Sequence, residues 1–142
     1  MNGHLPLSPA RFLALRLLPG EDLITGLRAQ MAQHGLQAAW IAGAVGSLTH
    51  ANLRYAAQPD GTLLEGAFEV IALGGTLDPE CEHLHLSISD EQGQMRGGHV
   101  LPGCRVRTTL ELVIGELQEY RFTRAPCSRS GYEELLVTPR TL

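Results

Sequence analysis

Hydrophobic and polar residues alternate with a period of two along much of the chain, a pattern typical of β-strands that bury one face. The alternation is clearest from Leu84 to Ser89, where three apolar side chains alternate with a histidine and two serines. Similar alternation, or a short apolar run between turn residues, predicts further strands at residues 11–18, 36–44, 48–57, 64–73, 105–114, 117–124 and 135–137.

One stretch has the period of a helix instead. Leu23, Leu27 and Met31 recur every four residues, which is the apolar stripe of an amphipathic helix. The acidic residues 21–22 are expected to lie in its first turn, where the helix dipole favours negative charge. Gly35 is a plausible stop after the last turn.

Together these patterns predict an α+β fold, a single domain with one main helix and a mainly antiparallel or mixed β-sheet of about seven strands. The chain contains no internal repeat and no linker. Residues 1–10 are expected to form an irregular lead-in, and residues 11–142 are expected to form the domain.

Residues 83–99 predict a β-hairpin that carries three of the six histidines. His83 and His85 are two residues apart on one strand, so both project from its polar face. Residues 90–93 (Asp-Glu-Gln-Gly) suit a three-residue loop, a type I turn closed by a left-handed glycine. In that register His85 faces His99 across the hairpin, whereas a loop one residue shorter or longer would turn His99 to the other face.

Three neutral imidazoles on rigid strands, with a fourth position open, are the arrangement that a catalytic or ligand-binding zinc site requires. We therefore predict that His83, His85 and His99 bind a divalent metal, with zinc as the ion that this donor set favours. Gly97 and Gly98 are expected to leave the space beside the site empty. The alternative is that the three histidines are ordinary polar residues of an exposed strand face.

Two carboxylates are candidate catalytic residues because they lie in largely apolar strands. Glu69 alternates with Phe68 and Val70, and a carboxylate in a buried strand is costly unless a cation or a metal pairs with it. We interpret it either as the partner of an arginine or as a general base near the histidines. Glu111 is the second candidate, although an ion pair with Arg107 on the same strand face is the simpler explanation.

Composition limits the partners and the location. The formal net charge is −4 and every basic residue is an arginine, so the overall balance disfavours general binding to nucleic acid, although a local arginine patch is compatible with it. Three cysteines without a Cys-x-x-Cys pair fit a reduced, cytoplasmic protein, and Cys81 and Cys104 do not share the register of the hairpin as ligands would. No apolar run approaches the length of a membrane span, so we expect a soluble protein with no membrane partner.

Several short segments spread over nearly the whole chain form a recognisable pattern: Leu18-Pro-Gly-Glu-Asp-Leu23, Gly46-Ser-Leu48, Glu65-Gly-Ala-Phe-Glu69, His83-Leu-His85, Gly97-Gly-His99, Thr109-Leu-Glu111, Tyr120-Arg-Phe-Thr-Arg124 and Gly131-Tyr-Glu-Glu-Leu135. Together they resemble the plant-and-prokaryote-conserved (PPC) domain in its free-standing prokaryotic form. The subunit fold and the His-x-His…His pattern also resemble, more distantly, acetolactate decarboxylase, a zinc enzyme.

The resemblance implies a compact subunit that assembles as a homotrimer, with a metal on the positions that correspond to His83, His85 and His99. In plants the same domain follows AT-hook segments that contact DNA, while the domain itself mediates assembly and partner contacts. The present chain has no Arg-Gly-Arg-Pro hook and is net acidic, which argues against direct DNA binding.

Two main functions stay open. The first is a trimeric, metal-carrying regulatory or interaction module whose partner is a protein, a small ligand or nucleic acid. The second is a zinc-dependent enzyme of the lyase or decarboxylase kind, acting on a small carboxylated or keto substrate. In that enzyme Glu69 or Glu111 would move a proton, and Arg54 or Arg107 would bind the carboxylate. A third interpretation is that the metal only clamps the hairpin.

Overall fold

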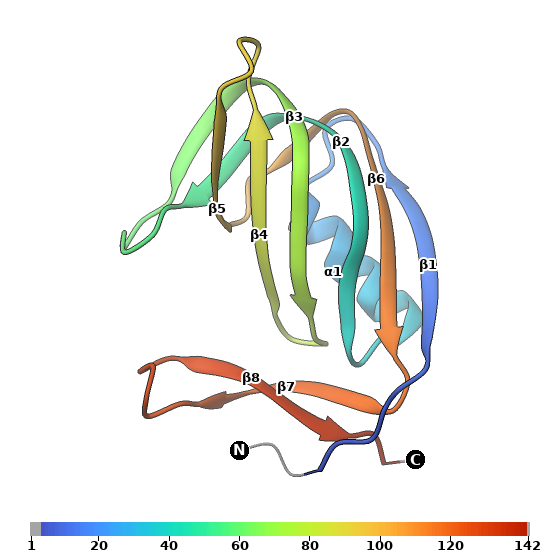
Figure 1. The fold of residues 1–142 in the computed structure, drawn as a ribbon. Helices are drawn as coiled ribbons and strands as arrows, with labels where there is room; N and C mark the ends of the chain where they lie inside the picture. The colour runs from blue at the N-terminus through green and yellow to red at the C-terminus, as the bar shows by residue number, and fades with distance from the viewer. Residues whose placement is uncertain (1–3, 142) are drawn as a thin grey trace.

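The computed structural model describes residues 4–141. Eight strands and one helix follow one another as β1 (Ala10–Leu17), α1 (Leu23–His34), β2 (Ala39–Arg54), β3 (Thr62–Leu77), β4 (Glu82–Ser89), β5 (Met95–Val100), β6 (Arg105–Leu117), β7 (Tyr120–Pro126) and β8 (Glu133–Pro139) (Figure 1). A mostly antiparallel sheet with a single helix confirms the predicted α+β class. Residues 1–3 of the expected lead-in lie outside the described residues, and residues 4–9 have no regular secondary structure.

Six strands form one antiparallel sheet in the order β1-β6-β2-β3-β4-β5. The end of β2 pairs a second time, with β5, so the sheet curls until its last strand meets β2 again. Strands β7 and β8 form a separate two-stranded hairpin, which runs below the ends of the sheet strands in Figure 1. The second pairing of β2 and the β7–β8 hairpin determine which residues surround the histidines of β4 and β5.

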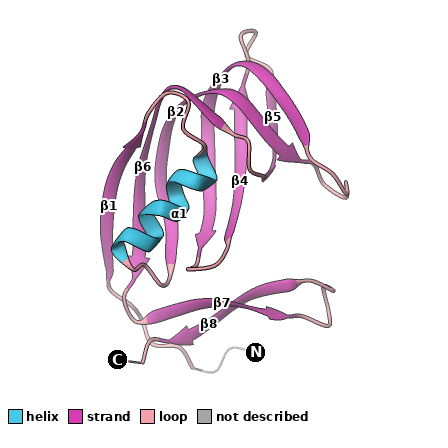
Figure 2. Ribbon diagram, turned by 180° about the vertical axis from the view of Figure 1, so that it is seen from behind, coloured by secondary structure: helices cyan, strands magenta, loops and turns pink. Residues whose placement is uncertain are grey.

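Helix α1 covers one face of the six-stranded sheet, and Figure 2 looks onto this covered side. Its buried side chains, among them Leu23 and Leu27, pack into the core. Gly35 ends the helix in the left-handed conformation at φ 60°, as predicted. Asp22 is the N-cap rather than a first-turn residue, because its carboxylate accepts a hydrogen bond of 3.0 Å from the backbone N–H of Thr25.

The strand boundaries differ from the prediction in three places. The predicted strands at residues 36–44 and 48–57 contribute to one long strand, β2. Residues 45–47, which separated the two predictions, lie inside this strand, and its pairing with β3 and β6 shifts register at several points. The pair Gly74–Gly75 lies inside β3, past the end of the strand predicted at residues 64–73. A Cβ on Gly75 would lie 1.9 Å from the carbonyl oxygen of His83, so only a glycine permits this close pairing with β4. The stretch 117–124 contains a turn, after which β7 begins.

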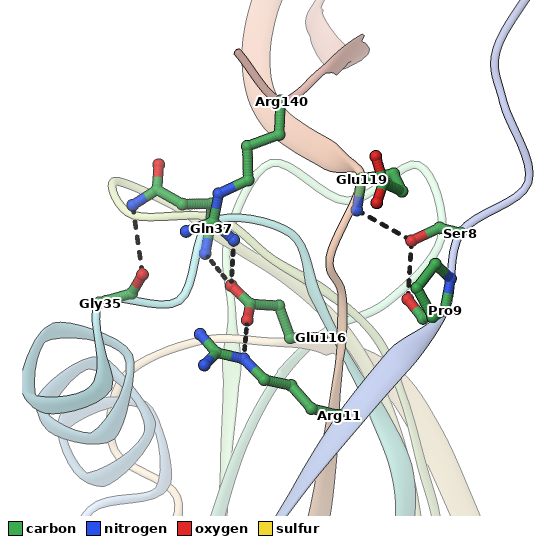
Figure 3. Close-up of polar contacts among 8 residues, drawn as sticks. All are labelled: Ser8, Pro9, Arg11, Gly35, Gln37, Glu116, Glu119 and Arg140. Carbon is green, nitrogen blue, oxygen red and sulfur yellow. Dashed lines mark hydrogen bonds and ion pairs between the residues drawn. The ribbon is translucent and has the colours of Figure 1, made fainter. Parts of the chain in front are cut away.

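A buried carboxylate joins the two ends of the described chain (Figure 3). Glu116 on β6 is 1% exposed and forms ion pairs with Arg11 at 2.5 Å and with Arg140 at 3.3 Å. It also accepts a hydrogen bond of 2.9 Å from the backbone N–H of Gln37, directly after the helix. One side chain thus ties β1, the connection from α1 to β2 and the segment after β8 together. Within residues 4–141, no helix has the length and apolar character needed to cross a membrane.

Candidate metal centre

The β4–β5 hairpin has the register that its turn predicts. Gly93 lies in the left-handed region at φ 78°, and its N–H donates to the carbonyl of Asp90 at 3.0 Å. The N–H of Asp90 donates in turn to the carbonyl of Gln94 at 2.9 Å, which closes a three-residue loop. His85 therefore lies directly opposite His99, and the predicted pairing is confirmed.

The three histidines converge on the face of the sheet that α1 leaves uncovered. Leu84 and Leu86 alternate with them and are buried in the core, so the imidazoles project to the other side. The ring centroids are 5.1 Å apart for His83 and His85, 5.3 Å for His83 and His99, and 5.8 Å for His85 and His99. One ligating nitrogen of each ring lies within 4.8 Å of the other two.

The donor set fits a divalent ion. Zinc bonded to nitrogen at about 2.0–2.1 Å in tetrahedral geometry holds its ligand atoms about 3.4 Å apart, so modest rotation of the imidazoles would bring all three within reach of one ion. Burial, the charge of His85 and then Arg124 lower the pKa of His83. Burial and then Arg54 lower the pKa of His99. Both shifts favour the neutral form of the ring, which is the form that binds a metal.

Arg54 reaches the site from the far end of β2. It is the cross-strand partner of His99, and such partners project from the same face of a sheet. Gly98 makes this approach possible, because a Cβ on Gly98 would lie 2.8 Å from the carbonyl oxygen of Arg54. The glycine therefore serves close packing of β5 against β2, not the empty space that the sequence suggested. Of the two predicted arginines, Arg54 is the one that the fold places beside the histidines.

The β7–β8 hairpin supplies further residues that sequence reasoning did not identify. Arg124 on β7 and Glu134 on β8 line the same pocket as the three histidines, which has a volume of about 1500 Å³. The Nε of Arg124 donates to the buried carboxylate of Asp78 at 3.0 Å. In the sequence, these two residues stand out only because they lie in the C-terminal segments 120–124 and 131–135 that resemble the PPC domain. Those segments contain no metal-ligand or catalytic motif of their own.

The remaining predicted residues lie away from the histidines. Glu69 and Arg107 line a second depression of about 400 Å³ near the turn of the β4–β5 hairpin, together with Glu91. Glu69 is exposed, so the expectation of a buried carboxylate is wrong, because the core covers only one face of β3. Glu111 is exposed as well, and its side-chain partner at 3.5 Å is the hydroxyl of Thr109 rather than Arg107.

Known proteins of several kinds are similar to this chain. The family described as the Plants and Prokaryotes Conserved (PCC) domain matches residues 6–118. A hypothetical protein from Salmonella cholerae-suis (Salmonella enterica) is 57% identical over 97% of this chain and 100% of its own, with a TM-score of 0.95. A metal-containing protein from Archaeoglobus fulgidus shares the fold at 23% identity over 95% of this chain and 99% of its own, with a TM-score of 0.79.

Two relatives are much longer than the present chain. The bifunctional protein GlmU of Synechococcus sp. (strain JA-3-3Ab) is 47% identical over 131 residues, which are 92% of this chain but 21% of that protein. The chain spans about a fifth of the length of the curated relatives it matches. Because the family match extends over most of the residues and the solved homologue has the same fold throughout, the chain belongs to the Plants and Prokaryotes Conserved domain family, the PPC family that its sequence resembles.

Proposed function

We propose that this chain is a homotrimeric PPC domain that binds a divalent metal, zinc, on His83, His85 and His99 and acts as a regulatory or interaction module. The observation that carries the proposal is the convergence of three ligating nitrogens within 4.8 Å on rigid strands. The relative of the same fold from Archaeoglobus fulgidus is described as metal-containing, which supports it. When bound, such an ion supplies a Lewis-acid centre.

Metal content in the purified protein tests this proposal. We expect one zinc ion per chain in the wild type and loss of the ion in His85→Ala, measured by elemental analysis after dialysis. His50→Ala is the matched control, because His50 also lies on a strand but hydrogen-bonds to Thr49 and stands outside the triad. Retention of the metal in His85→Ala, or its loss in the control alone, would refute the proposed site.

Self-association is supported by apolar side chains on the uncovered part of the sheet. Val45 on β2 is 58% exposed, Ile71 on β3 is 52% exposed and Val113 on β6 is 39% exposed. Apolar side chains gathered on neighbouring strands favour burial against another surface. A second and third copy of this chain would supply that surface.

The mass in solution tests the assembly. We expect light scattering to give three times the chain mass of 15.4 kDa. Val45→Glu places a charge in the proposed contact and should lower the mass, whereas Leu7→Glu, at a side chain that is already 97% exposed, should not. A monomeric wild type would contradict the trimer.

A modular role is supported by the Synechococcus relatives, in which the matching segment is a small part of a longer protein. The charge balance opposes direct contact with DNA, because the net charge is −4 and phosphate binding needs clustered positive charge. We expect no salt-dependent binding to duplex DNA in fluorescence anisotropy between low and physiological salt. Binding that weakens steeply as salt is raised would contradict this part of the proposal.

A second candidate is a zinc-dependent enzyme acting on a small carboxylated or keto substrate. The observation that favours it is the open pocket beside the triad, in which Arg54 offers a carboxylate partner and Glu134 a proton acceptor. This assignment replaces Glu69 and Glu111 with a carboxylate that lies near the histidines. The two candidates differ in turnover, so a screen of 2-keto and 2-hydroxy acids with the zinc-loaded protein separates them.

A further inference from the structure

We propose that the pocket beside the three histidines recognises a small dicarboxylate, which Arg54 holds from one side and Arg124 from the other. The inference rests on the proposed function for the role of the metal, and it adds the chemical class of the ligand. It also gives the β7–β8 hairpin a role in binding that ligand, and this hairpin lies beyond the residues 6–118 that match the family.

Arg54 is the first anchor. It lies directly across from His99 and lines the pocket. Among residues 4–141 it forms no ion pair with an acidic side chain, so its guanidinium is available to a ligand. A guanidinium presents paired donors that match the two oxygens of a carboxylate.

Arg124 is the second anchor, and the fold fixes it in place. Asp78 holds its Nε at 3.0 Å, while the other oxygen of Asp78 accepts hydrogen bonds from the backbone N–H groups of Glu80 at 2.9 Å and Cys81 at 2.7 Å. The Nη2 of Arg124 is buried and has no hydrogen-bond partner among the described residues. A buried donor without a partner is costly, which points to an acceptor that a ligand brings.

The two arginines stand on different sides of the triad. Arg54 comes from the curled end of β2 and lies directly across from His99, whereas Arg124 comes from β7 and is held by Asp78, in the connection between β3 and β4 that leads to His83. A ligand with one carboxylate would satisfy one of these positions. A ligand with a carboxylate at each end spans both, and its two negative charges also balance the positive charge that the arginines bring into an otherwise acidic protein.

Glu134 completes the pocket and narrows the choice of ligand. It lies on β8 and lines the pocket together with the three histidines and the two arginines. Its carboxylate would repel a compact, highly charged anion such as phosphate that sat in the space between the two anchors. The arrangement thus favours two separated carboxylates over one compact, highly charged group.

Calorimetric titration of the zinc-loaded and the metal-free protein with succinate tests the inference. We expect succinate to bind at least about tenfold more tightly than acetate or inorganic phosphate, because it offers a separate carboxylate to each anchor. Arg54→Gln and Arg124→Gln should each weaken succinate binding about 10- to 100-fold, the effect of losing a hydrogen bond to a charged group. Arg121→Gln, an exposed arginine on the same strand as Arg124, should leave the affinity unchanged.

The variants separate the outcomes. Arg124→Gln removes a partner of buried Asp78 and lowers stability. Arg54→Gln, whose exposed side chain pairs with no acidic residue in the described part of the chain, carries the test if the first variant does not fold. Wild-type protein that takes up no metal but binds succinate through both arginines would refute the proposed metal site and support the dicarboxylate site. Zinc-loaded protein that binds succinate no better than acetate, or binds it equally in Arg54→Gln, would overturn the inference while the metal site stands.

Discussion

His85 on β4 and His99 on β5 are direct partners across an antiparallel hairpin, and a three-residue loop fixes that pairing. The relationship depends on the number of residues in the loop, which the turn chemistry of residues 90–93 sets, because one residue more or fewer reverses the face to which every later side chain points. The convergence of the candidate ligands is therefore a property of the turn.

Shortening this turn by one residue should turn the side chain of His99 to the opposite face of the sheet from His83 and His85. We expect deletion of Gln92 to reduce metal content sharply, since the new loop shifts the register by one residue or strains the tip. Gln92→Ala keeps the length and should retain the metal. Elemental analysis of both variants, with circular dichroism to establish that each is folded, measures the difference, and equal metal content in the two would contradict a register-dependent site.

Substitution of the two neighbouring glycines of β3, Gly74 and Gly75, should affect the stability of the protein very differently. In Gly75→Ala the new methyl group would meet the carbonyl oxygen of His83 at 1.9 Å, so β3 and β4 cannot keep their present spacing. A Cβ on Gly74 would have no atom of residues 4–141 within 4 Å, so Gly74→Ala is the matched control. We expect a clear drop in the thermal unfolding temperature for Gly75→Ala alone. Similar unfolding temperatures for both variants would mean that the strands are less closely packed than described.

The ion-pair cluster at Glu116 should contribute to stability independently of the metal. Glu116→Gln removes the charge that Arg11 and Arg140 share, and we expect a loss of about 2 kcal/mol in the free energy of unfolding. Glu119→Gln alters an exposed side chain nearby and should change it little. Urea denaturation measures both values. Metal content should stay at the wild-type level, since the cluster lies apart from the histidines.

The pH dependence of the metal-free protein should follow the lowered pKa values of His83 and His99. Burial is the largest cause for both, and the unperturbed value is 6.5. Above that value both rings are neutral whether the protein is folded or not, so they add no pH dependence. As the pH falls below it, the unfolded chain binds protons more readily than the native one, and stability decreases until the native rings are protonated too.

A variant isolates this effect. His83→Gln combined with His99→Gln removes both titrating rings, so its stability should fall less between pH 7.5 and pH 5.5 than that of the wild type, both measured in the presence of a chelator. A double variant with the same slope as the wild type would indicate that other groups dominate acid destabilisation.

The local parts of the site are predictable from the sequence, and the reason is physical. The turn chemistry of residues 90–93 and the alternation on either side of it determine the hairpin register without help from the rest of the chain. The helix end at Gly35 is predictable for the same reason, because a left-handed glycine acts within one turn. Where short-range geometry decides the structure, a single sequence is enough.

The long-range parts of the site are not predictable in this way. Arg54 meets His99 because the bulged strand β2 curls far enough to pair with β5, and no local pattern sets that curvature. Arg124 and Glu134 reach the pocket through a hairpin that follows the sheet in sequence. Glu69 was misplaced because alternation indicates two faces of a strand but not whether both are covered.

The most direct test of the account is a crystal structure of the zinc-loaded protein, with data collected on both sides of the zinc absorption edge. We predict one anomalous peak per chain, bonded to a nitrogen of each of His83, His85 and His99 at about 2.0–2.1 Å. A peak at any other set of side chains, or three imidazoles that remain free of metal while the protein contains stoichiometric zinc, would contradict the account.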